Sequence, residues 1–186
     1  MLKRNTAANA SAGLLFAMAG IAPEATARLN LLDTLLRPGG LGDRLANAGE
    51  IRAEGGQAIA NSDDITTLDT AQRIVDAALA AFGEVHVLIN NAGVLRDRMF
   101  ISLSEEDWDM VMRVHLKGHY CLANILGRRW RDLAKAGTPV DARIINTSSG
   151  AGLQGSVGQS NYSAAQGGSA ALTLVQAAEL ARYGVT

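Results

Sequence analysis

Two hydroxyl side chains, Ser149 and Tyr162, stand thirteen positions apart on either side of a glycine-rich loop at Gly150–Gly158. Ser149 ends an apolar run that is typical of a buried strand, and Tyr162 lies in the first turn of a predicted helix. An alcohol beside a phenol suits proton transfer to or from a carbonyl or alcohol oxygen, provided that the pKa of the phenol is lowered. The same pattern also fits an ordinary Ser/Gly loop followed by a helix.

A second polar segment, Asn90–Gly93, follows another apolar run directly. Its asparagine side chains can tie neighbouring strand ends together, and Ala92 and Gly93 would let a flat ligand approach the backbone. Taken alone, the segment fits a strand-to-loop turn better than a binding site.

Two of the three histidines, His115 and His119, are four positions apart, which places them on one face of a helix. This spacing allows a metal pair, but no carboxylate or third ligand is evident nearby. We therefore expect core or surface histidines and no metal site. The single cysteine, Cys121, excludes an internal disulfide.

An alternation of strands and helices must position these residues. Short apolar runs predict strands, and apolar residues at helical spacing predict helices between them. The expected strands are Gln57–Asn61, Val85–Asn90 and Arg143–Thr147, and the expected helices are Thr70–Phe82, Ser104–Ala136 and Asn161–Tyr183. Helices of this length between strands imply right-handed crossovers and a parallel sheet. The sequence thus predicts the α/β class, as an incomplete Rossmann-like three-layer parallel sheet with helices on both faces.

Length and composition exclude several functions. The chain has 186 residues, of which 48% are hydrophobic and 19% charged, with 17 basic against 18 acidic residues. This composition argues against disorder and provides no basic surface for nucleic acid. No apolar stretch is long enough to span a bilayer, so we expect no membrane partner.

The first 27 residues contain the three parts of a secretory signal. These parts are a charged start at Lys3 and Arg4, an apolar stretch at Ala12–Ala22 and the small residues Ala25–Ala27. An Ala/Leu-rich helix or a poorly structured leader would have the same composition. We expect a cytoplasmic location, with export through residues 1–27 as the minor alternative.

Together these segments resemble the short-chain dehydrogenase/reductase family. Asn90–Gly93 is similar to the family's N-N-A-G element, and Ser149 precedes Tyr162 by the spacing that the family uses. The resemblance extends over Ile51–Thr186. Two segments are similar to the branch that acts on 3-oxoacyl and 3-hydroxyacyl thioesters, namely Leu95–Met99 and Val114–Gly118.

The resemblance implies hydride transfer between NAD or NADP and a carbonyl or secondary alcohol of a small-molecule substrate. By the family pattern, Tyr162 is the general acid or base, Ser149 orients the substrate oxygen, and His115 stands at the position of a proton-relay asparagine. The acid Asp64 would contact the adenine. The cofactor would also be lined by Asn91, Ala92, Gly93, Tyr162 and Gln166.

Gln166 departs from the family pattern, which has a lysine four residues after the tyrosine. Tyr162 and Gln166 still share a helix face, but a neutral amide replaces the cation that favours the phenolate. The amide can still bind a ribose hydroxyl. Because a phenol has a reference pKa of about 10, we predict that turnover is lower by about two orders of magnitude or more.

The first fifty residues also lack the family's glycine-rich phosphate motif, Thr-Gly-x-x-x-Gly-x-Gly. The glycines of this motif bring the pyrophosphate to backbone N–H groups at a helix start, so we expect weak dinucleotide binding. We interpret residues 1–50 as a degenerate or non-native segment before a partial domain at 51–186. A frameshifted or fragmentary gene and a divergent protein both explain this arrangement.

A non-catalytic, self-associating module is the alternative function. In the family, the two long helices form the subunit interface, and here they correspond to residues 104–136 and 161–183. Small residues in the second helix, such as Ala164, Ala165 and Gly168, let helices approach closely. We therefore expect a homo-oligomer that forms through these helices, with or without catalysis.

Overall fold

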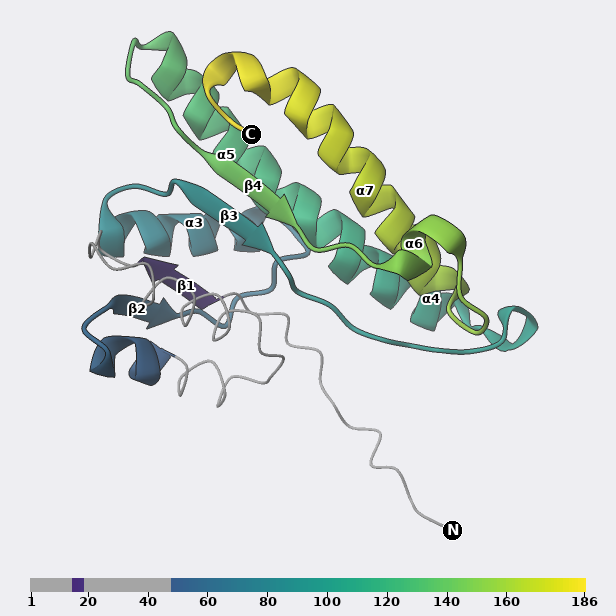
Figure 1. Cartoon of the computed structure of the whole chain (residues 1–186). Coiled ribbons are helices and arrows are strands. Elements are labelled where there is room, and N and C mark those ends of the chain that lie inside the picture. The colour runs from purple at the N-terminus through teal and green to yellow at the C-terminus, as the bar shows by residue number, and fades with distance from the viewer. Residues whose placement is uncertain (1–14, 19–47) are drawn as a thin grey trace.

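The computed structural model describes residues 15–18 and 48–186, in which strands and helices alternate along most of the chain (Figure 1). The elements in chain order are β1 (Leu15–Met18), β2 (Gln57–Ala60), α3 (Leu68–Phe82), β3 (Val87–Asn90), η1 (Phe100–Ser102), α4 (Glu105–Met112), η2 (Arg113–Gly118), α5 (His119–Lys135), β4 (Arg143–Asn146), α6 (Gly150–Gln154), α7 (Ser160–Leu180) and η3 (Ala181–Tyr183). The predicted order of three strands and three long helices from residue 57 onward is confirmed, with boundaries shifted by a few residues.

Strands β3 and β4 are parallel neighbours, and Val87 pairs with Arg143 while Asn90 pairs with Asn146. The connection between them runs through α4, η2 and α5. Such a crossover is the unit from which Rossmann-like sheets are built. The α/β class and the parallel sheet are thereby confirmed, and the sheet is small, as expected for an incomplete fold.

Strand β1 pairs with β2 in the antiparallel direction, from Leu15 opposite Ala60 to Met18 opposite Gln57. These four N-terminal residues fall in the stretch for which the sequence suggested a leader or a helix. For them the strand is the observed state, because hydrogen bonds to a neighbouring strand outweigh intrinsic helix propensity. The rest of residues 1–27 lies outside the described residues. The expected boundary at residue 50 falls within a helical segment that covers residues 48–53.

The helices of the described part cover one face of β3 and β4. Side chains at alternate strand positions share a face, so Leu88 and Asn90 point the same way. Leu88 packs with α3 and α5, and Trp130 of α5 donates a hydrogen bond from Nε1 to Val85 O at 2.8 Å. The buried core around them consists of Ile65, Ala71, Ile74, Val75, Ala78, Val85, Cys121, Leu122, Ala123, Leu126, Ala142 and Val185.

The opposite face of these two strands is partly open. Val87 and Ile145 are 48% and 47% exposed. Over β3 and β4, the described residues therefore show one helical layer. A further helical segment, residues 48–53, packs on Ala58 and Ala60 of β2 in a separate small cluster. No helix in the described ranges is long and apolar enough to cross a membrane.

The long helix predicted over Ser104–Ala136 contains a π-helical turn. Ser104 caps its start, since Oγ accepts a hydrogen bond from Asp107 N at 3.1 Å. The chain then continues from α4 through η2 into α5 without a loop. Single π-helical turns inside α-helices are frequent at functional sites, and this one carries His115.

Candidate active site

Asn90 and Asn146 join the carboxyl ends of the two parallel strands. Asn90 Nδ2 donates to Asn146 Oδ1 at 2.8 Å. Asn146 Nδ2 in turn donates to Thr173 Oγ1 at 2.8 Å and to Gln176 Oε1 at 2.9 Å, both on α7. The predicted tie between strand ends is confirmed for Asn90, and it fixes α7 above the sheet edge where ligands bind in folds of this class.

Two buried histidines hold the loop that follows β3. His115 Nε2 lies 2.9 Å from both the backbone nitrogen and the carbonyl oxygen of Val94. His119 Nε2 lies 3.3 Å from Ala92 O, and its Nδ1 lies 3.2 Å from Ser169 Oγ on α7. Burial lowers the pKa of His115, and it lowers the pKa of His119 to about 4. Both rings are therefore neutral at pH 7.

The ring of His115 occupies the space beside Gly93. An ideal Cβ built on Gly93 would lie 2.5 Å from His115 Cε1, a distance that real Cβ atoms do not show. We expected this glycine to leave room for a flat ligand. The His115 imidazole instead fills the space into which a side chain at position 93 would extend.

Gln166 is 3% exposed and binds the other side of the same ring. Its Nε2 lies 2.9 Å from His115 Nδ1. Its Oε1 is buried and has no hydrogen-bond partner in the described part of the chain. Its backbone carbonyl accepts a hydrogen bond from Ser148 Oγ at 3.2 Å. The residue at the family's lysine position is thus buried and tied to two other segments.

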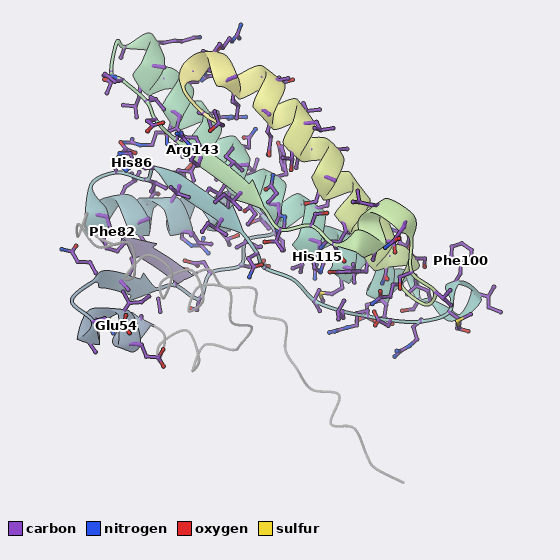
Figure 2. All side chains as sticks on the ribbon, in the orientation of Figure 1. Glu54, Phe82, His86, Phe100, His115 and Arg143 are labelled. Atoms are coloured by element: carbon purple, nitrogen blue, oxygen red, sulfur yellow. The ribbon has the colours of Figure 1, made fainter. Side chains whose placement is uncertain are left out.

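Tyr162 contacts His115 ring to ring, one turn before Gln166 on α7. The two ring centroids are 5.1 Å apart and the planes meet at 83°, which is the edge-to-face arrangement that aromatic pairs prefer. The phenol is half-buried, and its hydroxyl makes no hydrogen bond within the described residues. Figure 2 shows His115 at the point where the chain after β3 passes the start of the long helices.

Ser149 is held against α7 because α6 packs closely on that helix. A Cβ built on Gly152 would lie 2.6 Å from the backbone of Gln166 and Gly167, so only glycine permits this crossing. Ser149 caps α6, and its Oγ accepts a hydrogen bond from Ala151 N at 3.3 Å. The crossing brings the segments of Ser149 and Tyr162 together.

Asn161 is a site residue that the sequence analysis missed. It is fully buried, and its Nδ2 donates to Arg96 O at 3.1 Å and to Asp107 O at 3.3 Å. Its Oδ1 accepts from Tyr162 N at 2.8 Å. An asparagine on the buried side of a helix start must find partners, and this requirement was the available signal.

The loop after the N-N-A-G segment is tied to the same helix start. Arg98 N donates to Gly158 O at 2.8 Å, and Gln159 Nε2 donates to Asp97 Oδ2 at 3.1 Å. Beyond these contacts the loop leaves the body of the molecule, and Phe100 at its tip is 74% exposed (Figure 2).

The other predicted cofactor residues lie on neighbouring segments. Asp64 is exposed, and its carboxylate accepts hydrogen bonds from Thr66 N at 2.8 Å and Thr66 Oγ1 at 2.9 Å. The next residue, Ile65, packs on Gly118, which places this pair beside η2. Asn91 is partly buried. Within residues 15–18 and 48–186, no group of three or more His, Cys, Asp or Glu side chains could hold a metal.

The comparisons with known proteins identify the family. The short chain dehydrogenase family model matches residues 18–186. A crystal structure of a short chain dehydrogenase from Mycobacterium avium superimposes with a TM-score of 0.76 at 53% identity, over 77% of this chain and 49% of that one. The chain belongs to the short-chain dehydrogenase family.

Two curated relatives have names that match the branch expected from the sequence. Hydroxyacyl-CoA dehydrogenase ChsB1 of Mycobacterium tuberculosis is 47% identical over 133 residues, which are 70% of this chain and 42% of that protein. The 3-oxoacyl-[acyl-carrier-protein] reductase of Synechocystis is 37% identical over 74% of this chain and 53% of that protein. The resemblance to this branch is confirmed. The chain spans about half the length of these relatives or less.

The residues present fit the sugar side of the NAD or NADP that the family uses. The buried, unpartnered Oε1 of Gln166 is an acceptor that a ribose hydroxyl would satisfy. The exposed carboxylate of Asp64 is an acceptor for the amino group or hydroxyls of a nucleoside. The first fifty residues, in which the family's phosphate motif is missing, lie largely outside the described residues.

Proposed function

We propose that this chain is an NAD(P)-dependent oxidoreductase that reduces a 3-oxoacyl thioester or oxidises a 3-hydroxyacyl thioester. The names of the relatives support this substrate class. The observation that carries the proposal is the packing of Tyr162, His115 and Gln166 against one another, with the Ser149 segment crossing the same helix.

In reduction, the Tyr162 hydroxyl donates a proton to the carbonyl oxygen of the substrate. Ser149 donates a hydrogen bond to the same oxygen, since its lone pair already accepts from Ala151 N. The nicotinamide, when bound, supplies the hydride that reaches the carbonyl carbon. The product is the alcohol, and oxidation runs through the same groups in reverse.

The proposal includes impaired turnover. No positive charge from residue 166 stabilises the phenolate, and His115 supplies none at pH 7 because burial lowers its pKa. The uncharged side chains of Gln166 and His115 therefore give no electrostatic assistance to proton transfer by Tyr162. We expect turnover about 100-fold or more below that of a site with a cation at this position.

The test is a titration of the purified chain with NADH and NADPH, followed by an assay with a 3-oxoacyl-CoA. We expect saturable binding of at least one nucleotide and slow oxidation of it that depends on the thioester. Tyr162→Phe is the matched control, because it keeps the ring and should keep nucleotide affinity while losing turnover. A folded chain that binds neither nucleotide would contradict the proposal.

Two expectations from the sequence remain part of the proposal. Residues 1–50 are a degenerate or non-native segment ahead of a partial domain at 51–186, and the protein acts in the cytoplasm. A protein whose N-terminus, sequenced after expression in its own host, starts near residue 28 would instead support export.

The second candidate function is self-association through α5 and α7. These helices run side by side (Figure 1), and a groove of about 660 Å³ lies between their outer faces. Tyr120 and Val175 line the groove and are 41% and 51% exposed. We infer that a second copy of this chain covers them. Sedimentation should show a dimer or larger species that Val175→Glu dissociates, whereas a monomeric wild type would exclude this function.

A further inference from the structure

His119 connects three segments around the candidate site. Its backbone carbonyl accepts a hydrogen bond from Asn90 Nδ2, at the end of β3, at 3.4 Å. Its ring nitrogen Nε2 lies 3.3 Å from Ala92 O, and Nδ1 lies 3.2 Å from Ser169 Oγ on α7. The His119 side chain and Ser169 are both buried. The ring therefore joins the loop after β3 to the helix that carries Tyr162.

We propose that His119 and Ser169 form a clamp that sets the position of the Asn91–Gly93 loop relative to α7, and that the clamp thereby positions a bound nucleotide against Tyr162. Both are positioning residues. Their role toward the nucleotide rests on the proposed function. The clamp itself consists of contacts within the chain, so it can be measured without a ligand.

The acceptor at Ala92 determines which ring nitrogen of His119 carries the proton. A carbonyl oxygen can only accept, so the neutral ring donates from Nε2–H to Ala92 O. Nδ1 then has a free lone pair, which accepts the hydroxyl proton of Ser169. Within the described residues, neither ring nitrogen nor Ser169 Oγ has a further hydrogen-bond partner. The donors therefore run in one direction, from Ser169 through the imidazole to Ala92.

The neutral state of the ring agrees with this arrangement. Burial lowers the pKa of His119 to about 4, so one ring nitrogen is free to accept at pH 7. An imidazolium would carry protons on both nitrogens and could not accept from Ser169.

The two ends of the clamp belong to the elements that the proposed function uses. Ala92 lies in the loop that is expected to line the cofactor. Ser169 follows Tyr162 by seven residues, which is about two turns of α7 and places both on one side of the helix. An imidazole is rigid, so its two nitrogens hold loop and helix at a fixed spacing. This spacing matters for hydride transfer, because a misplacement of about 1 Å can lower turnover about 100-fold.

The first measurement is the side-chain ¹⁵N spectrum of His119 in the full chain without ligand at pH 7. The wild type should show one neutral tautomer, with the proton on Nε2 and with Nδ1 unprotonated and hydrogen-bonded. Ser169→Ala removes the donor, so the Nδ1 resonance should move toward that of a ring nitrogen without a hydrogen bond. The amide resonances of Ala92 and Gly93 should shift in the same variant, because the loop loses its tie to α7.

Ser163→Ala is the matched control, because it is the same substitution on the same helix. Ser163 Oγ is buried and has no hydrogen-bond partner in the described part of the chain, so the control removes no hydrogen bond. It should leave the resonances of His119, Ala92 and Gly93 unchanged.

The second measurement is the affinity for NADH and NADPH of the wild type and of both variants, each first shown to be folded by circular dichroism. Loss of one neutral hydrogen bond behind the loop should raise the dissociation constant of Ser169→Ala about fivefold. Ser163→Ala should bind as the wild type does.

The inference is overturned if wild-type His119 carries its proton on Nδ1, a result that does not depend on the folding of any variant. It is also overturned if Ser169→Ala leaves the Nδ1 and loop resonances unchanged, or binds nucleotide as tightly as a wild type that binds it. If the wild type binds neither nucleotide, the proposed function fails, and the spectra of His119 alone decide whether the clamp exists.

Discussion

The imidazole of His115 stands where a side chain at Gly93 would begin, with 2.5 Å between Cε1 and an ideal Cβ on that glycine. Gly93, which follows β3, is therefore required by His115 of η2. Together with the bonds from His115 to Val94 and from His119 to Ala92, this contact fixes the loop at the edge of the sheet.

Gly93→Ala should destabilise the protein by about 1–3 kcal/mol, because the added methyl group overlaps a ring that cannot move without losing hydrogen bonds. Chemical denaturation of the variant measures this loss. In a His115→Ala background the same substitution should cost at least about 1 kcal/mol less, as expected for residues in contact. Equal costs in the two backgrounds would show that the ring is not the obstacle.

Asn161→Ala should cost about 1–3 kcal/mol and loosen the start of α7, since it leaves Arg96 O and Asp107 O without their side-chain donor. Hydrogen exchange at the amide of Tyr162, which now bonds to Asn161 Oδ1, should become faster. Gln72→Ala, an exposed change on α3, serves as the control and should alter stability by less than about 0.5 kcal/mol. Unchanged exchange at Tyr162 would contradict the assigned contact.

Acid should destabilise the fold through its buried histidines. The folded state holds the pKa of His119 near 4, whereas in the unfolded chain it returns to about 6.5. The unfolded state therefore binds the proton first, and stability falls as the pH drops from about 6.5 to about 4. The loss from His119 reaches up to about 3 kcal/mol, and His115, whose pKa is also lowered, adds to it.

Unfolding free energies measured at several pH values between 7 and 4 test this dependence. His119→Asn should reduce the slope, because the variant has no imidazole to protonate at this position. A wild-type protein as stable at pH 4.5 as at pH 7 would contradict the burial of both rings.

The sequence predicted the helices and strands, and it predicted which residues are candidates for the reaction. Apolar runs and helical periodicity placed β3, β4, α3 and α7 to within a few residues, since burial on regular elements leaves a repeating pattern. The tie between Asn90 and Asn146 was also predictable, because parallel strands that end together place their last side chains together.

The contacts among the candidate active-site residues were not predictable in the same way. Gln166 and His115 are 51 positions apart, and neither periodicity nor propensity indicates that they bind each other. The π-helical turn that carries His115 has the same composition as an α-helix, so its wider register depends on tertiary packing. The role of Asn161 depends on which backbone carbonyls approach it, and only the folded chain shows them.

In the proposed function, a neutral glutamine limits an otherwise competent hydride-transfer site. Gln166→Lys adds a cation beside Tyr162, and a neighbouring positive charge favours the phenolate. The decisive measurement is kcat/KM for oxidation of NADH or NADPH by a 3-oxoacyl-CoA, compared between wild type and Gln166→Lys. We predict a rise of about 100-fold that Tyr162→Phe abolishes in the same background. Equal rates for the two proteins, with nucleotide bound by both, would contradict a limiting role of Gln166.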